Sequence, residues 1–134
     1  MVGTAIISFD CEGKWGVADN LSSPYARKIT DESLHWAYRA IFDLLDKYKL
    51  PATFAFVGLF TFPSDAQVEL LKELAGELPY LRQVPAAIQR RDEGWSAPWV
   101  LDLINSRHEI GFHGFTHTPW SMLSPTQAAR ELQM

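Results

Sequence analysis

Two clusters of polar side chains have the residue types that hold a metal ion or move a proton. The first is acidic, with Cys11 between Asp10 and Glu12, and the second contains His113 and His117. A catalytic zinc ion is commonly held by two imidazoles and one carboxylate, with a further position left open for water. Two histidines four apart on a helical turn face the same way, as a shared ligand requires. Either cluster, taken alone, is also compatible with solvated loop residues.

The acidic cluster has two roles to fill, a metal ligand and a general base. If the alternation of a strand continues through it, Asp10 and Glu12 point to one side and Cys11 to the other. This favours Glu12 as the ligand and Asp10 as the base, with Cys11 packed inward as a small hydrophobe. Zinc also binds sulfur readily, so Cys11 stays open as an alternative ligand.

Each cluster directly follows a predicted strand. The apolar runs 4–9 and 52–57 and the short segment 109–112 predict strands, and the segments between them contain predicted helices over 31–50, 64–78 and 96–106. Strands that alternate with helices indicate an α/β fold with a parallel sheet or barrel. Reactive groups of such folds gather at the carboxyl ends of the strands, so both clusters are expected on one rim.

Helix-start signals refine this assignment. Ser64 with Gln67 has the capping-box pattern, and Ser124, Pro125 and Gln127 predict the start of a last helix. The stretch 79–95 has no clear period and is expected to be a loop. Because the sequence stops about two turns into the last helix, we expect residues 1–134 to be the N-terminal part of one domain, truncated at its C-terminus.

Composition narrows the function classes. The 134 residues carry a net charge of −4 with no basic run, which argues against a nucleic-acid surface. A single cysteine permits no disulfide within the chain and favours a reducing compartment. No secretion signal and no apolar stretch of ~20 residues is present, so a cytoplasmic location without a membrane span is expected.

At these clusters the sequence resembles the NodB-type polysaccharide deacetylases, carbohydrate esterase family four. The first family motif, Thr-Phe-Asp-Asp-Gly, is similar to residues 8–13, which read SFDCEG. The second, His-Ser/Thr-x-x-His, is similar to residues 113–117, HGFTH, and residues 52–58, ATFAFVG, resemble the family's second strand. Cys11 replaces the second aspartate, which binds the metal, but some branches use Asp-x-Glu with the outer residue as ligand. Gly114 stands where Ser or Thr is usual.

The resemblance implies a distorted (β/α) barrel of seven strands, of which this chain supplies the first three βα units. It also implies a hydrolase that removes acetyl groups from an N-acetylated sugar or polysaccharide, using zinc, cobalt or another divalent ion. The implied site consists of the base Asp10 and the ligands Glu12, His113 and His117. Trp15, Tyr25 and Trp120 are candidates for stacking on sugar rings, with plain loop packing as the equal alternative. The family's later motifs, including a histidine general acid, have no counterpart here. We therefore expect the chain alone to lack useful activity, and its open sheet edge to favour self-association.

Three other functions remain open. An amidohydrolase of the same fold would act on a small cyclic amide or ureide. A non-catalytic binding module would keep the fold without the chemistry, although it has no need of a base beside a metal. A structural domain could carry the metal-like pattern by chance.

Overall fold

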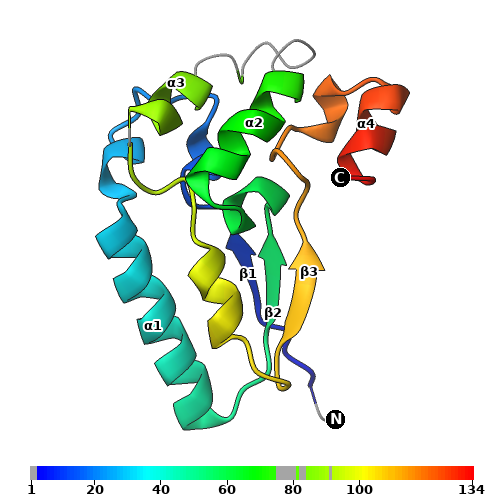
Figure 1. The fold of residues 1–134 in the computed structure, drawn as a ribbon. Coiled ribbons are helices and arrows are strands. Elements are labelled where there is room, and N and C mark those ends of the chain that lie inside the picture. The colour runs from blue at the N-terminus through cyan, green and yellow to red at the C-terminus, as the bar shows by residue number, and fades with distance from the viewer. Residues whose placement is uncertain (1–2, 75–80, 82–83, 91) are drawn as a thin grey trace.

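The chain folds around a three-stranded parallel sheet, shown in a computed structural model that describes residues 3–74, 81, 84–90 and 92–134 (Figure 1). The strand order is β1-β2-β3, with β1 at Ser8–Cys11, β2 at Thr53–Phe56 and β3 at Glu109–Phe112. Both strand pairs are parallel, so all three strands end on the same rim. The predicted parallel α/β sheet is confirmed.

Helices fill the connections between the strands. α1 (Asp31–Tyr48) links β1 to β2, and α2 (Ser64–Leu74) and α3 (Val84–Gln89) lie between β2 and β3. After β3 the chain forms α4 (Pro125–Glu131). Short 3₁₀ helices complete the connections: η1 Gly13–Val17, η2 Ala26–Lys28, η3 Gly58–Thr61, η5 Pro98–Leu103 and η6 Trp120–Met122.

The buried strand side chains belong to one face of the sheet. Phe54 of β2 is fully buried, and its ring stacks on Phe9 of β1 at 5.3 Å and on Phe42 of α1 at 4.6 Å between centroids. Residues of the opposite face, such as Asp10, which pairs in register with Ala55, are less buried. The helices therefore cover one face, and the strand ends stay accessible from the other.

Capping signals in the sequence correctly predict where two helices begin. Thr30 caps α1 through a reciprocal pair of hydrogen bonds with Ser33, and Lys49 ends the helix in the left-handed region at φ 54°. Ser124 forms the predicted capping box with Gln127 at the start of α4. These local hydrogen bonds satisfy backbone donors that have no partner within the helix.

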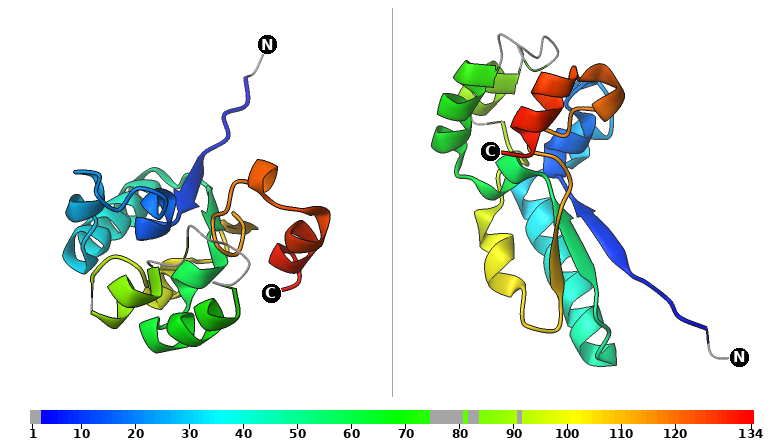
Figure 2. Two further views of the ribbon diagram at one scale, coloured as in Figure 1. Left: turned by 90° about the horizontal axis from the view of Figure 1, so that it is seen from above. Right: turned by 90° about the vertical axis from the view of Figure 1, so that its right-hand side faces the viewer.

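Two predicted element bounds are wrong. β1 begins at Ser8 rather than residue 4, because its partner β2 is four residues long and pairs only from Thr53, opposite Ser8. Ile7 still contacts the sheet, since its carbonyl accepts the Thr53 N–H at 3.0 Å, whereas residues 3–6 run away from the body of the molecule (Figure 2). The predicted helix over 96–106 is instead the 3₁₀ helix η5, from Pro98 to Leu103.

The predicted capping role of Gln67 is also wrong. Its side chain is fully buried, and Nε2 lies within hydrogen-bond distance of three backbone carbonyls, those of Leu59, Phe62 and Trp95. Gln67 therefore links α2 to two loops instead of turning back on its own helix. The predicted loop 79–95 contains α3, while residues 75–80, 82–83 and 91 lie outside the described part.

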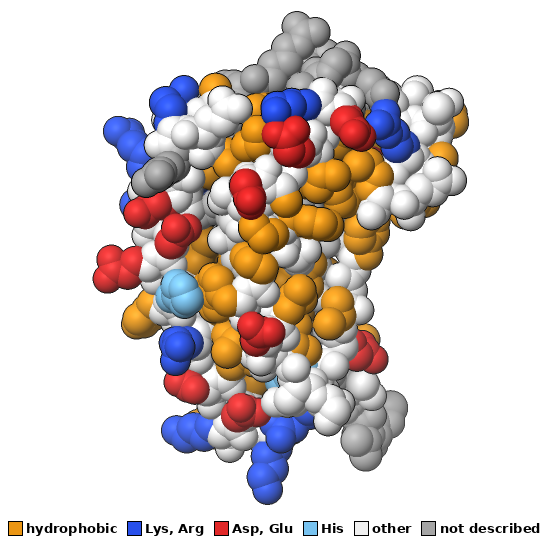
Figure 3. Space-filling view, in the orientation of Figure 1, with side chains coloured by type: hydrophobic (Ala, Val, Ile, Leu, Met, Phe, Trp, Pro, Cys, Tyr) orange, Lys and Arg blue, Asp and Glu red, His pale blue; other side chains and the backbone are white. Residues whose placement is uncertain are grey.

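The surface mixes charge with exposed apolar side chains. Hydrophobic side chains spread over the middle of the face seen in Figure 1, interrupted by single carboxylates, and most basic side chains lie at its edge (Figure 3). β3 contributes two exposed apolar side chains, Ile110 (64% exposed) and Phe112 (53%). In the part of the chain that the structure describes, no helix is long and apolar enough to cross a membrane.

Candidate metal centre

The two polar clusters meet on the rim where the strands end. Glu12, His113 and His117 each offer one ligand atom, and these atoms all lie within 4.8 Å of one another. Oε2 of Glu12 lies 2.9 Å from Nε2 of His117 and 3.4 Å from Nε2 of His113. Asp10 stands beside them, with Oδ2 3.9 Å from Nε2 of His113. The three donors are half-buried, so a small cation could reach them from solvent.

The turn after β1 places Glu12. This residue follows the last strand residue, Cys11, and precedes η1, whose first turn closes when Trp15 N–H donates to the Glu12 carbonyl at 2.9 Å. The Glu12 side chain folds back over Gly16, where an added Cβ would lie 1.9 Å from Oε1. Glycine at position 16 therefore leaves the space that the carboxylate occupies.

The turn after β3 places the histidines without a helix. His113 continues the sheet, because its N–H donates to the Phe56 carbonyl at 2.8 Å. The chain then turns through two left-handed residues, Gly114 at φ 80° and His117 at φ 61°. The sequence-based expectation of a helical turn is wrong here. An irregular loop brings the two imidazoles to a centroid distance of 5.0 Å.

Cys11 points away from this cluster. Its side chain is fully buried in the core, and burial raises the pKa of the thiol to about 11. Zinc binds the thiolate rather than the thiol, so this environment opposes a ligand role at neutral pH. The alternation argument from the sequence anticipated this inward orientation.

The cluster is electrostatically coupled. The hydrogen bond with His117 lowers the pKa of Glu12 below its ordinary value, with burial acting in the opposite direction. The same hydrogen bond raises the pKa of His117, again against the effect of burial. Without a metal ion, therefore, a carboxylate and an imidazolium stabilise one another at this site.

A cavity of about 190 Å³ adjoins His117, and it is lined by Trp15, Gly16, Asp19, His117, Pro119 and Met122. Trp15 is 1% exposed, and its indole N–H donates to the Trp95 carbonyl, so little of its ring is available to stack on a sugar. Tyr25 (69% exposed) and Trp120 (54%) offer far more ring surface. Asp19 was missed by the sequence analysis, because no motif or spacing marks it.

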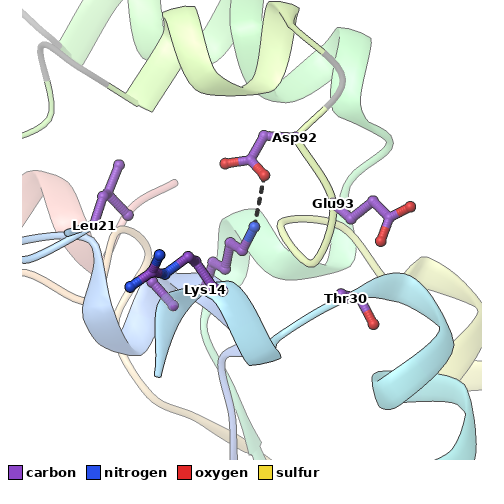
Figure 4. A pocket seen from close by; sticks show the side chains of 7 residues that line it. Lys14, Leu21, Thr30, Asp92 and Glu93 are labelled. Carbon is purple, nitrogen blue, oxygen red and sulfur yellow. Dashed lines mark hydrogen bonds and ion pairs between the residues drawn. The ribbon is translucent and has the colours of Figure 1, made fainter. Parts of the chain in front are cut away.

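A larger cavity of about 380 Å³ lies beside η1 and has a polar lining (Figure 4). Within it the nearly buried Lys14 forms an ion pair with Asp92 at 2.7 Å. The Lys14 N–H also donates to the Gly94 carbonyl at 2.8 Å. These contacts hold η1, which begins directly after Glu12, against Asp92 and Gly94.

The other two histidines do not reach the rim. His35 of α1 stacks on Trp99 with ring centroids 3.7 Å apart. His108 is buried edge-on against Phe42 and Phe54 at the opposite end of β3. Neither histidine is therefore placed to donate a proton near Glu12.

Two histidines and one carboxylate beside a further carboxylate, at the carboxyl ends of parallel strands, are a donor set of the kind that catalytic zinc sites use. The family profile described as "Polysaccharide deacetylase" matches residues 29–134. The chain belongs to this family, whose members are generally metal-dependent deacetylase-type hydrolases. The match includes His113 and His117 but begins after Asp10 and Glu12, so only the fold joins the acidic cluster to the matched region. No curated protein and no solved structure gives a significant match.

Proposed function

We propose that the protein acts in metal-dependent removal of acetyl groups from an N-acetylated sugar or polysaccharide. The observation that carries this proposal is the convergence of Glu12, His113 and His117 within 4.8 Å, with Asp10 beside them, in a chain of the polysaccharide deacetylase family. The proposed ligands are Glu12, His113 and His117.

The donor set fits a zinc-type divalent ion. One carboxylate oxygen and two imidazole nitrogens are a common protein ligand set for catalytic zinc, and they leave a coordination position for water. Gly16 supports the fit, because any larger residue would displace the Glu12 carboxylate. Cobalt has similar ligand preferences and remains a second candidate.

The residues around this set have separable tasks in amide hydrolysis. When bound, a divalent ion supplies a Lewis acid that polarises the acetyl carbonyl and lowers the pKa of water. Asp10, with its side chain 61% exposed on the rim, is the proposed base that accepts the proton of the attacking water. Tyr25 and Trp120, both more than half exposed, are the proposed stacking surfaces for sugar rings.

Protonation of the leaving amine has no histidine to perform it in this chain. His35 and His108 are occupied by aromatic packing away from the rim, and the other two are proposed ligands. Positioned proton donation contributes ~10²–10⁴-fold to such reactions. We therefore propose slow turnover by these 134 residues alone.

The sheet also supports the proposed barrel. Its strands follow one another in sequence order, and the buried strand side chains lie on the helix-covered face. A barrel keeps all helices outside, whereas a doubly wound sheet carries them on both faces. We propose that the three strands are the first three βα units of a distorted seven-stranded barrel.

Single-turnover acetate release tests the function. Zinc-loaded protein in excess over N-acetylglucosamine oligomers is expected to release acetate slowly, and Asp10→Asn and the metal-free protein are expected to release none. Lys28→Gln, a change on the exposed side of η2, is the matched control and should leave the rate unchanged. Hydrolysis of a cyclic amide or ureide, with no acetate released, would establish the amidohydrolase alternative. Zinc binding with neither reaction would favour the binding module, and absence of zinc binding would favour the structural domain.

A further inference from the structure

A buried carboxylate of α4 contacts the loop that carries His117. Glu131 is 5% exposed, and its Oε2 accepts hydrogen bonds from the backbone N–H groups of Phe115 at 2.7 Å and Thr116 at 3.1 Å. Its Oε1 accepts the Thr116 hydroxyl at 2.5 Å. Thr116 is itself fully buried. All three donors belong to the two residues just before His117.

The hydrogen-bond chain continues past His117. Oγ1 of Thr116 lies 2.5 Å from Oγ1 of Thr118, which is also buried. Because the Thr116 hydroxyl gives its one hydrogen to Glu131, the Thr118 hydroxyl must donate to Thr116. The carboxylate thus restrains the chain on both sides of His117.

The location of this carboxylate is unfavourable in itself. Burial removes a charge from water, and the C-terminal end of a helix repels negative charge. Glu131 is the last residue of α4. Hydrogen bonds from three donors offset this cost, which indicates that the charge serves the loop and not the helix.

The opposite edge of the loop is held by the segment after β2. The carbonyls of Gly114 and Phe115 accept hydrogen bonds from Gly58 N–H at 2.9 Å and Leu59 N–H at 3.0 Å. The loop therefore has its carbonyls fixed on one side and its N–H groups fixed on the other. His117 sits at the end of this restrained segment, in a left-handed conformation (φ 61°) that few residues other than glycine adopt.

We propose that Glu131 is a positioning residue, which holds the His113–Thr118 loop in the conformation that presents His117 to Glu12. An effect of Glu131 on zinc affinity rests on the proposed function, whereas its effect on the conformation of the loop does not. Gly114 has no hydroxyl with which to restrain the loop, and the pair Thr116–Glu131 supplies that restraint two residues further on. Glu131 accepts its hydrogen bonds from the backbone of Phe115 and Thr116 and from the Thr116 hydroxyl, so it acts through these two residues.

Glu131→Gln tests the proposal, because glutamine keeps the size but points either a weaker acceptor or an NH₂ donor at the loop amides. The zinc affinity, measured by competition with a chromophoric chelator, is expected to fall ~10–100-fold, as for other residues that orient metal ligands. Glu109→Gln is the matched control, since Glu109 is an exposed carboxylate of β3 that accepts one hydrogen bond from Thr53. Its zinc affinity should equal that of the unchanged protein.

Amide hydrogen exchange in the metal-free protein provides a readout independent of zinc. The Phe115 and Thr116 amides should exchange about tenfold faster or more in Glu131→Gln, while amides within α1 keep their rates. A purely structural role would instead speed exchange throughout the domain. Loop amides that exchange at the original rate, or an unchanged zinc affinity in a folded variant, would overturn the proposal.

A second variant tests the proposal if Glu131→Gln does not fold. Thr116→Val keeps the side-chain size and removes the hydroxyl that donates to Glu131 and accepts from Thr118. It is expected to weaken zinc binding by up to about tenfold and to speed exchange of the same two amides. Neither effect in Thr116→Val would refute the positioning role. If the unchanged protein binds no zinc, the proposed function fails, and the exchange rates alone decide whether Glu131 holds the loop.

Discussion

Oε2 of Glu12 lies 2.9 Å from Nε2 of His117, although the two residues stand near opposite ends of the chain. The contact pairs a carboxylate of lowered pKa with an imidazole of raised pKa. A metal ion at this position would replace the proton that the pair shares. The same geometry therefore predicts opposite pH dependences for metal binding and for the stability of the metal-free protein.

Zinc affinity should fall steeply as the pH is lowered from 8 to 5.5. A ligand histidine must be neutral, and the raised pKa of His117 means that its protonation competes with zinc already above the ordinary value of 6.5. Competition by one proton gives a slope of ~1 log unit in the dissociation constant per pH unit. Chelator-competition titrations at several pH values measure this slope, and a flat profile would contradict the assignment.

The metal-free protein should show a different optimum. The contribution of His117 to folding is fully present below its unfolded pKa, near 6.5, and is lost as the pH rises through its raised folded value. The contribution of Glu12 is present above its ordinary pKa of 4.5 and is lost as the pH falls through its lowered folded value. The pair should therefore stabilise the fold most between about pH 4.5 and 6.5. Urea denaturation in EDTA, with Glu12→Gln as the reference, isolates this contribution.

Gly16→Ala should weaken metal binding without unfolding the protein. The new Cβ would lie 1.9 Å from Oε1 of Glu12, and the end of that flexible side chain can rotate away at little cost in stability. The rotation moves the carboxylate from the histidines, so the zinc affinity should drop ~10-fold or more. Gly3→Ala is the control, because nothing lies within 4 Å of a Cβ added there. Equal zinc content of both variants by elemental analysis would argue against Glu12 as ligand.

Cys11→Ser and Glu12→Gln should separate the two candidate ligands. Cys11 is fully buried and its thiol pKa is raised to about 11, so the serine variant should keep its zinc and lose stability by ~1–3 kcal/mol from burying a hydroxyl. Glu12→Gln should lose the zinc, and without metal it should lose only the stability that the Glu12–His117 pair contributes. X-ray absorption spectroscopy offers a direct check, since a zinc–sulfur distance near ~2.3 Å would assign the site to Cys11.

Phe54→Ala should lower the free energy of unfolding by ~3–5 kcal/mol, the usual cost of removing a buried phenylalanine. Its ring is fully buried between Phe9 and Phe42 and joins β1 to α1 through β2. Ile110→Ala, at a position 64% exposed on β3, should cost less than ~1 kcal/mol. Urea denaturation curves of the two variants test the difference, and equal midpoints would show that the core lies elsewhere.

The sequence predicted the parts of this molecule that local interactions decide. Thr30 and Ser124 start helices through hydrogen bonds to residues three positions away, and β2 lies within the predicted strand 52–57. Gln67 does not follow its motif, because its side-chain amide lies within hydrogen-bond distance of the carbonyls of Leu59, Phe62 and Trp95, all outside its helix. Contacts between distant segments leave no such local signal.

The same distinction applies to the candidate site. Residue types and the position of strand ends indicated Asp10, Glu12, His113 and His117, while the irregular loop around His117 and the surroundings of Asp19 and Glu131 were not foreseen. A glutamate in a predicted surface helix gives no indication that its carboxylate is buried. Only the packing of α4 against the loop reveals its contacts.

The strand order has a mechanical consequence. Within the described residues, β1 and β3 pair only with β2, so the acidic and histidine halves of the site follow the two outer strands. An ion held by Glu12, His113 and His117 would cross-link the ends of β1 and β3, between which no backbone hydrogen bonds are described. Zinc at 100 times its dissociation constant would raise the free energy of unfolding by ~2.7 kcal/mol. Removal of the ion by a chelator would loosen the sheet first at the carboxyl ends of its strands. The opposite end, where Phe42 and Phe54 contact His108, would stay packed.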